Sequence, residues 1–150
     1  MIYLVTRNRQ LFKSEYYEII SLEKSIEIIK SWDLIQFDTE TSGRDPHVCK
    51  ILCAQFGNRK AGIQIVVDTS TIDICNYRNL LETKLIVGHN LKFDIQFLYN
   101  HDIIPENCWD TMIIEQLLHL GFNNKFFHYS LKDVAERRLK IDIDKTGIVL

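Results

Sequence analysis

The sequence predicts an α/β fold in which a mixed β-sheet is flanked by helices. Three β-prone runs, at residues 34–38, 51–56 and 62–67, follow one another with short turns, which is typical of an antiparallel meander. Further on, short apolar runs alternate with segments of helical periodicity, which is typical of βα units. A length of 150 residues fits one domain. We therefore expect a single domain over 1–150, in which 1–33 forms an N-terminal strand and helix extension.

The N-terminal part is expected to hold two short strands and one helix. Residues 2–5 and 16–20 are β-prone and are expected to pair across a polar, basic turn. Ser21 is a good N-cap for the following segment, SLEKSIEIIKS, whose apolar residues recur at helical spacing. Residues 34–38 read as a continuous apolar strand, which predicts that both faces of the sheet are covered there.

The C-terminal half is expected to be mostly helical. Helices are predicted at residues 76–83, 90–100, 111–120 and 131–139, with a short buried strand at residues 85–87. Asp110 and Ser130 are the expected N-caps of the last two helices. The apolar stripe of the helix at 111–120 consists of Met112, Ile113, Leu117 and Leu118.

Composition excludes several classes of protein. The net charge of -2 is not the strongly basic balance of a protein that relies on many phosphate contacts, although an enzyme that grips only a strand end remains compatible with it. The four cysteines form no CxxC pair, so reduced core thiols are expected. The N-terminus lacks the apolar region of a signal peptide, and no apolar run is long enough for a membrane span. We expect a cytoplasmic protein.

Two carboxylates end the strand at residues 34–38. In LIQFDTET, Asp38 and Glu40 are separated by one residue, so their side chains should project from the same face of a strand. Two like charges repel and are costly to desolvate unless a cation joins them. The pair is therefore a candidate metal site.

A third carboxylate belongs to the helix predicted at 90–100. In VGHNLKFD, Asn90 and Asp94 are four residues apart and share one face of that helix, which begins just after a short strand. Such a helix can present Asp94 to Asp38 and Glu40. Three converging carboxylates suit a hard divalent cation such as Mg²⁺, which prefers oxygen ligands.

These motifs resemble a known family. DTET after an apolar strand and VGHNLKFD about fifty residues later resemble the DnaQ-like (DEDD) 3′–5′ exonucleases, and in particular the proofreading domain of family A DNA polymerases such as DNA polymerase I. WDTMIIEQLL and HYSLKDVAERRL resemble two further helices of that domain. The resemblance implies a ribonuclease H-like fold, two Mg²⁺ or Mn²⁺ ions, a single-stranded DNA 3′ end as substrate and a polymerase domain in the parent protein.

The resemblance also implies roles for individual residues. The catalytic residues and metal ligands would be Asp38, Glu40 and Asp94. The residues that bind substrate would be Thr39, Thr41, His89, Asn90 and Phe93.

The family's third motif, Tyr-x-x-x-Asp or His-x-x-x-x-Asp on a late helix, is not found. Only Asp142 and Asp144 follow the last predicted helix. We therefore expect a truncated or impaired form that lacks the last family helices and exposes an apolar patch. Two alternatives stay open: a ribonuclease D-like exoribonuclease, and a catalytically inactive domain that binds nucleic acid or serves as a scaffold.

Overall fold

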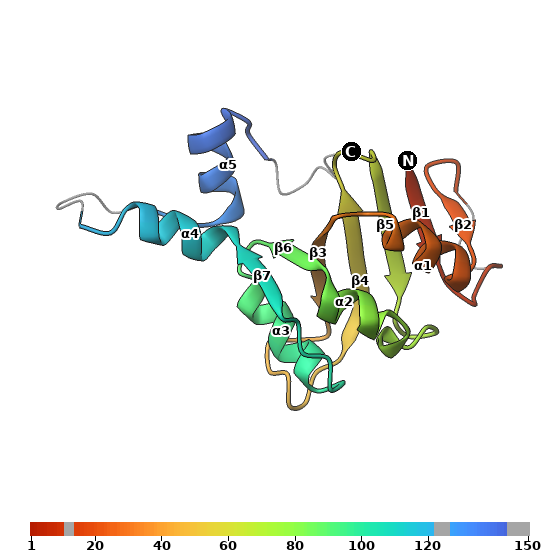
Figure 1. Ribbon diagram of the computed structural model, residues 1–150. Coiled ribbons are helices and arrows are strands. Elements are labelled where there is room, and N and C mark those ends of the chain that lie inside the picture. Colours follow the sequence, from red (N-terminus) through yellow and green to blue (C-terminus); the bar gives the residue numbers. More distant parts are fainter. Residues whose placement is uncertain (11–13, 122–126, 144–150) are drawn as a thin grey trace.

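A computed structural model describes residues 1–10, 14–121 and 127–143. Its centre is a seven-stranded mixed sheet with the strand order β2-β1-β5-β4-β3-β6-β7 (Figure 1). The elements are β1 (Ile2–Val5), β2 (Glu18–Ile20), α1 (Leu22–Lys30), β3 (Leu34–Thr41), β4 (Ile51–Asn58), β5 (Ile63–Asp68), the 3₁₀-helix η1 (Ile74–Tyr77), α2 (Arg78–Thr83), β6 (Leu85–Gly88), α3 (Leu91–Tyr99), β7 (Asn107–Asp110), α4 (Thr111–Leu118) and α5 (Leu131–Leu139). The predicted α/β class is confirmed.

The pairing of the strands places β2 at one edge of the sheet and β7 at the other. β3, β4 and β5 pair antiparallel, which confirms the predicted meander. β1 lies parallel between β2 and β5, so the two N-terminal runs do pair. On the other side, β6 and β7 extend the sheet in parallel from β3. β7 was not predicted, because most of its residues are exposed and carry no apolar alternation.

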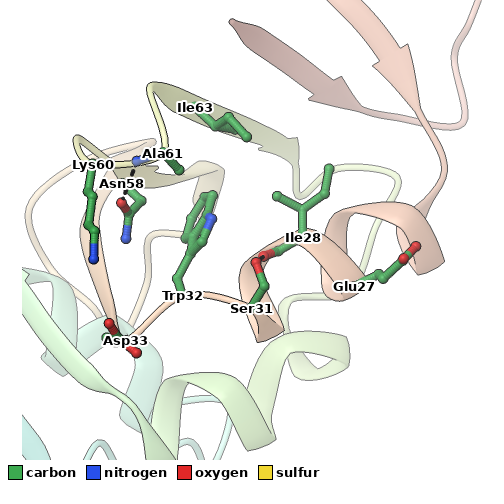
Figure 2. Close-up of a pocket in the computed structure, with 9 residues that line it drawn as sticks. All are labelled: Glu27, Ile28, Ser31, Trp32, Asp33, Asn58, Lys60, Ala61 and Ile63. Carbon is green, nitrogen blue, oxygen red and sulfur yellow. Dashed lines mark hydrogen bonds between the residues drawn. The ribbon is translucent and has the colours of Figure 1, made fainter.

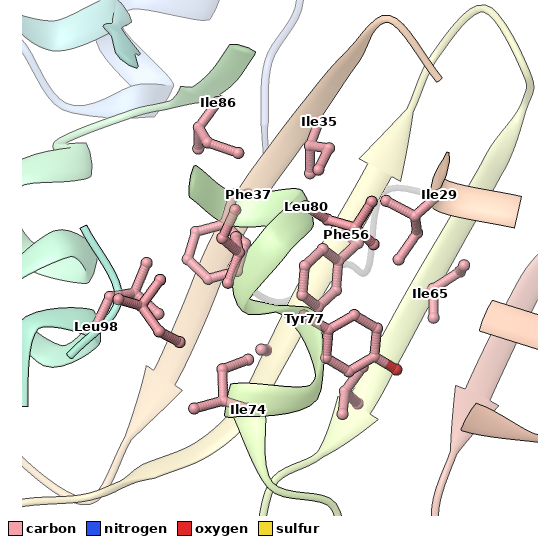
Figure 3. Packing of buried hydrophobic residues seen from close by; sticks show 14 of the residues in the cluster. Ile29, Ile35, Phe37, Phe56, Ile65, Ile74, Tyr77, Leu80, Ile86 and Leu98 are labelled. Carbon is pink, nitrogen blue, oxygen red and sulfur yellow. The ribbon is translucent and has the colours of Figure 1, made fainter. Parts of the chain in front are cut away.

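The apolar core lies on one face of the sheet. Figure 3 shows Ile29 of α1, Tyr77 of η1 and Leu98 of α3 converging on the strands. The Phe56 ring stacks on Tyr77 with centroids 4.8 Å apart and meets Phe37 edge-on at 5.3 Å. These ring contacts fix η1 against β4 and β4 against β3, the strand that carries Asp38 and Glu40.

The predicted burial of both faces of β3 is wrong. Its residues alternate strictly between buried and exposed or partly exposed positions, and Gln36 faces solvent. The reason is that the buried residues of α1, α2 and α3 belong to one core cluster, on one face of the sheet. Ile35 and Phe37 point into this cluster, whereas Gln36 points away from it. The face that stays open is the one that carries Asp38.

Helices α4 and α5 project from the β7 edge of the sheet (Figure 1). The N-caps Asp110 and Ser130 are confirmed by hydrogen bonds to backbone N–H groups of the first turn. The apolar stripe of α4 is largely exposed, and the buried residue of this helix is Glu115, which does not belong to the stripe. The expected exposed apolar surface is therefore present. Its large side chains include Ile113, Leu117, Leu118, Leu120, Leu131 and Leu139.

The cysteines only partly fit the prediction of core thiols. All four are free, but Cys49, Cys53 and Cys75 are only partly buried and Cys108 is exposed. Cys108 is exposed because it belongs to the edge strand β7. Among the described residues, every helix is too short or too polar to cross a bilayer.

Candidate metal centre

Strand β3 carries the two carboxylates that the sequence singled out. Asp38 and Glu40 both occupy exposed positions of its alternating pattern, while Thr39 between them is buried. The two carboxylates therefore project from the same face, as predicted. The register of β3 against β4 shifts between Glu40 and Thr41, and the pairing continues with Thr41 opposite Ile51. Such an irregularity disturbs the ladder locally beside the acidic pair.

Helix α3 places the third carboxylate beneath the same strand. Asp94 is 3% exposed, and its Oδ1 atom accepts hydrogen bonds from the backbone N–H of Thr39 at 2.9 Å and from the Thr39 hydroxyl at 2.6 Å. Thr39 thereby fixes the orientation of Asp94 relative to β3. The sequence assigned Thr39 to substrate, whereas in the structure its hydroxyl is committed to this carboxylate.

The electrostatics of this region favour a cation. Burial, with a further contribution from the negative charge of Asp38, raises the pKa of Asp94 to about 6, against the opposing effect of the Thr39 hydrogen bonds. The protein around Asp38 and the neighbouring charge of Glu40 raise the pKa of Asp38 as well. Asp38 and Asp94 thus resist ionisation, chiefly because burial penalises their charge and also because a negative charge lies nearby, and a divalent cation would offset both effects.

The three carboxylates do not converge on one point. The group with ligand atoms within 4.8 Å of one another in the described part of the chain is a different one, formed by Asp73, Cys75 and His101. A site for two ions about 3.5–4 Å apart does not require every ligand atom to surround a single ion. The donor set of Asp38, Glu40 and Asp94 contains only carboxylate oxygens, which fits Mg²⁺ or Mn²⁺.

The start of α3 depends on a glycine that sequence reasoning did not assign to the site. A Cβ atom on Gly88 would lie 2.9 Å from the carbonyl oxygen of Phe37 and 2.7 Å from Cδ1 of Leu91. Only glycine allows β6 to approach β3 this closely just before α3 begins. Its place between an apolar strand and a helix is the signal that could have revealed it.

His89 connects three segments. Its Nε2 atom lies 2.8 Å from the carbonyl oxygen of Tyr129 and its Nδ1 atom lies 2.9 Å from the hydroxyl of Thr111. Because a carbonyl oxygen can only accept, Nε2 donates. Both ring nitrogens are therefore engaged within the chain, so a role of His89 in binding substrate stays a prediction.

Asn90 and Phe93 lie on the first turn of α3. Asn90 occupies the N-cap position in the left-handed conformation (φ 60°), and its exposed side chain makes no capping hydrogen bond. Phe93 is partly buried, with its ring 5.1 Å from that of Phe97. Thr41, at the end of β3, donates its hydroxyl to the carbonyl oxygen of Gly43. The amide of Asn90 is thus the most accessible of these predicted substrate contacts.

Asp110 does more than cap α4. One of its carboxylate oxygens accepts from the backbone N–H of Met112 at 2.9 Å and from that of Asn90 at 3.0 Å. The other oxygen lies 3.4 Å from the backbone N of Lys92. A single carboxylate therefore ties together the beginnings of α3 and α4.

A fourth carboxylate is not assigned. Asp142 is exposed and forms an ion pair of 3.0 Å with Lys132 on α5, while Asp144 lies outside the described residues. The site consequently rests on the three carboxylates of β3 and α3.

A pocket of about 530 Å³ lies elsewhere, between the end of α1 and the turn that joins β4 to β5 (Figure 2). Trp32 and Ile28 form its apolar wall, and Lys60 and Asp33 stand at its rim. None of its lining residues belongs to the acidic site. The functional assignment therefore depends on β3 and α3 and not on this pocket.

Comparison with known proteins decides the family. A family described as 3′–5′ exonuclease matches residues 16–149. The chain belongs to the 3′–5′ exonuclease family. It is 34% identical over 126 residues to DNA polymerase I of Aquifex aeolicus (strain VF5), an alignment that covers 83% of this chain and 20% of that protein. The chain thus spans about a fifth of the length of this relative.

Several solved structures share the fold of this chain. NrnC of Brucella melitensis with bound Mg²⁺ is 18% identical with a TM-score of 0.66, over 99% of this chain and 67% of that one. RNase D of Escherichia coli, an exoribonuclease involved in structured RNA processing, is 15% identical with a TM-score of 0.68, over 95% and 34%. The Nibbler EXO domain of Aedes aegypti is 10% identical with a TM-score of 0.70, over 97% and 71%. The predicted ribonuclease H-like architecture is confirmed.

Proposed function

We propose that this chain is a metal-dependent 3′–5′ exonuclease that hydrolyses the terminal phosphodiester bond at the 3′ end of single-stranded DNA. The observation that carries the proposal is the placement of Asp94, buried and fixed by Thr39, beneath the strand that presents Asp38 and Glu40. Membership of the 3′–5′ exonuclease family supports the reaction. The NrnC structure with bound Mg²⁺ supports the type of cofactor.

The proposed chemistry assigns a task to each carboxylate. Asp38, Glu40 and Asp94 would hold two Mg²⁺ or Mn²⁺ ions, which supply an activated water and neutralise the departing 3′ oxygen. Asp38 and Glu40 face solvent, so metal ions held by them could bind a substrate phosphate from that side. Thr39 keeps Asp94 oriented and thereby limits the reorganisation required when substrate binds. Water oxygen bonds to phosphorus, the bond from phosphorus to the 3′ oxygen breaks, and a nucleoside 5′-monophosphate leaves.

DNA is the proposed substrate because the relative with 34% identity is a DNA polymerase. Asn90 and Phe93, on the first turn of α3 beside Asp94, are proposed to contact the terminal nucleotide, and Thr41 to face its sugar. The likeness to RNase D is 15% in identity and concerns the fold. A polymerase domain in the same protein is a further part of this proposal, and so is a cytoplasmic location.

The proposal is tested with single-stranded DNA labelled at its 5′ end. With Mg²⁺ or Mn²⁺ we expect stepwise shortening from the 3′ end and release of nucleoside monophosphates. Asp38→Ala should reduce the rate at least about a hundredfold, since even partners of metal ligands are worth roughly 10–100-fold. Asp33→Ala, which removes an exposed aspartate of the pocket in Figure 2, is the matched control and should leave the rate unchanged.

Two further measurements separate the alternatives. Competition between DNA and RNA 3′ ends of the same sequence should favour DNA, and a clear preference for RNA would support the ribonuclease D-like activity instead. Calorimetric titration with Mn²⁺ should show binding that Asp38→Ala removes. If Mn²⁺ does not bind and no shortening occurs, the chain is an inactive member of the family.

A further inference from the structure

We propose that Asp73, Cys75 and His101 form a second metal site, which binds a borderline divalent cation such as Zn²⁺. One ligand atom from each of the three side chains lies within 4.8 Å of the other two. The site is separate from the acidic centre formed by Asp38, Glu40 and Asp94. Asp73 and Cys75 lie at the start of η1, and His101 lies just after the C-terminal end of α3. The second site does not depend on the proposed nuclease activity.

Both segments of this site are anchored in the core. Ile74, between Asp73 and Cys75, is 2% exposed, and Figure 3 shows it pointing toward the sheet. Ile103, two residues after His101, is fully buried. Arg78 holds the two segments together, because its guanidinium donates to the carbonyl oxygens of His101 and Asp102. The ligands are thus brought together by a rigid frame and not by two independent loops.

The donor atoms indicate which cation fits. A thiolate, an imidazole and a carboxylate are a mixed S, N and O set, which Zn²⁺ binds and which hard cations such as Mg²⁺ do not favour. Bonds of about 2.0–2.3 Å to a tetrahedral Zn²⁺ place the ligand atoms roughly 3.3–3.7 Å apart. Because the ligand atoms lie within 4.8 Å of one another, they need to approach by at most about 1.5 Å, which rotation of the partly buried Cys75 and the exposed Asp73 can provide.

The charges of the site are suited to exchange a proton for a metal ion. Backbone hydrogen bonding from Cys75 lowers the pKa of Asp73, which is therefore ionised at neutral pH. Burial, together with the nearby Asp73, raises the pKa of the Cys75 thiol, so the thiol holds its proton until a metal displaces it. The Arg78 guanidinium, 4.0 Å from the sulfur, favours the thiolate once it forms. With one carboxylate and one thiolate, a bound divalent cation is neutralised.

The location suggests a structural role. Three protein ligands leave a fourth tetrahedral position for water. A bound ion would link η1 to the segment that ends α3, the helix whose first turn contains Asn90 and Asp94. We therefore expect the ion to stabilise the position of α3 without taking part in hydrolysis.

The test uses Co²⁺ as a spectroscopic probe for Zn²⁺. Titration of the metal-free protein with Co²⁺ should produce the near-ultraviolet absorption of a cobalt–thiolate bond, and Zn²⁺ should displace it. Binding should release a proton and should strengthen with rising pH. Cys75→Ser should abolish the absorption, and His101→Gln should weaken binding at least about tenfold, comparable with the loss of a partner of a metal ligand.

Matched controls locate the site. Cys108→Ser removes the exposed thiol of β7 and should leave the cobalt absorption intact. Asp38→Ala should also leave it intact, which separates this site from the acidic centre. Thermal unfolding without metal shows whether each variant folds. The proposal is overturned if the unchanged protein gives no thiolate absorption, or if a folded Cys75→Ser variant keeps it.

Discussion

Two regions of the protein are stabilised by different kinds of contact. One is the sheet body, which consists of the seven strands with α1, α2 and α3, and the other is the pair of helices α4 and α5. In the sheet body, apolar side chains such as Phe56 and Tyr77 are fully buried. In the α4–α5 pair, large apolar side chains such as Leu117 are exposed and the buried residue of α4 is Glu115. Apolar burial stabilises the first region, and an ionic cluster joins the second.

The ionic cluster is compact. Glu115 accepts from Nε of Arg137 at 3.1 Å and from Nε of Arg138 at 2.9 Å, so both arginines of α5 grip one carboxylate of α4. The Arg137 guanidinium also lies 5.5 Å from the centroid of the Phe127 ring. These contacts depend on charge and geometry, and they contribute less than a packed core. The sheet body should therefore stay folded under conditions in which the contact between α4 and α5 is already lost.

The largest expected effect belongs to the sheet body. Phe56→Ala removes a fully buried ring that contacts Phe37 and Tyr77, and should lower the free energy of unfolding by about 3–5 kcal/mol. Leu117→Ser, on the exposed face of α4, should change it by less than about 0.5 kcal/mol. Denaturant unfolding measures both. Equal losses would mean that the two regions share one apolar core.

A smaller effect, of opposite sign, is expected at Asp94. The folded protein keeps the Asp94 proton up to about pH 6, whereas an ordinary aspartate loses it near its value of 3.8. The wild-type free energy of unfolding should therefore fall as pH rises through this interval, by up to about 3 kcal/mol. Asp94→Asn keeps an acceptor for Thr39 and removes the charge. At pH 8 without divalent cations it should stabilise the protein by about 1–3 kcal/mol.

Urea unfolding at pH 8 and at pH 4 measures this difference. The gain from Asp94→Asn should shrink toward zero at the lower pH, where the wild-type side chain is itself protonated. Mg²⁺ should stabilise the wild type at pH 8 and not the variant. A variant that is less stable than the wild type at pH 8 would show that the buried charge is not penalised.

The smallest effect is expected in the α4–α5 pair. Glu115→Gln weakens the bonds to Arg137 and Arg138 and should destabilise α5 locally by about 1–2 kcal/mol, with little change in the unfolding of the sheet body. Hydrogen exchange should then accelerate about tenfold in α5 and stay constant in β3 and β4. Glu136→Gln on the exposed face of α5 is the control and should change neither.

Glu115 and Asp94 should respond to pH in opposite directions. The arginine partners lower the pKa of Glu115, so its contribution should persist until the pH falls below the ordinary glutamate value of 4.5 and is lost there. Asp94 in the sheet body responds in the other direction, because its protonation removes a buried charge. Exchange in α5 that accelerates already between pH 7 and 5 would contradict this assignment.

The sequence predicted the elements that carry strong local signals. The caps at Ser21, Asp110 and Ser130 were predicted, and so was the common face of Asp38 and Glu40, because capping and strand alternation depend on neighbouring residues. Strand β7 was missed because an edge strand needs no apolar alternation. The contact between Thr39 and Asp94 could not be predicted from the sequence either, since it depends on how α3 packs against β3.

The stripe on α4 shows a further limit. Its spacing at Ile113, Leu117 and Leu118 correctly predicts a helix, but periodicity does not reveal which face is covered. The covered face holds Glu115, whose partners Arg137 and Arg138 lie 22 and 23 residues away in the chain. Likewise, the close approach that requires Gly88 becomes evident only when β6 lies beside β3.

The shared cap at Asp110 has a consequence for how a nucleic acid can be held. Helix N-termini often bind phosphate through free N–H groups and a partial positive charge. At the starts of α3 and α4 the backbone amides of Asn90 and Met112 already donate to Asp110. The negative charge of this carboxylate offsets the partial positive charge of both helix N-termini. A phosphodiester that approaches the acidic centre therefore meets a closed anion site there. If the proposed function holds, its charge would have to be balanced by cations held by Asp38, Glu40 and Asp94, and substrate binding should then depend on metal as much as catalysis does.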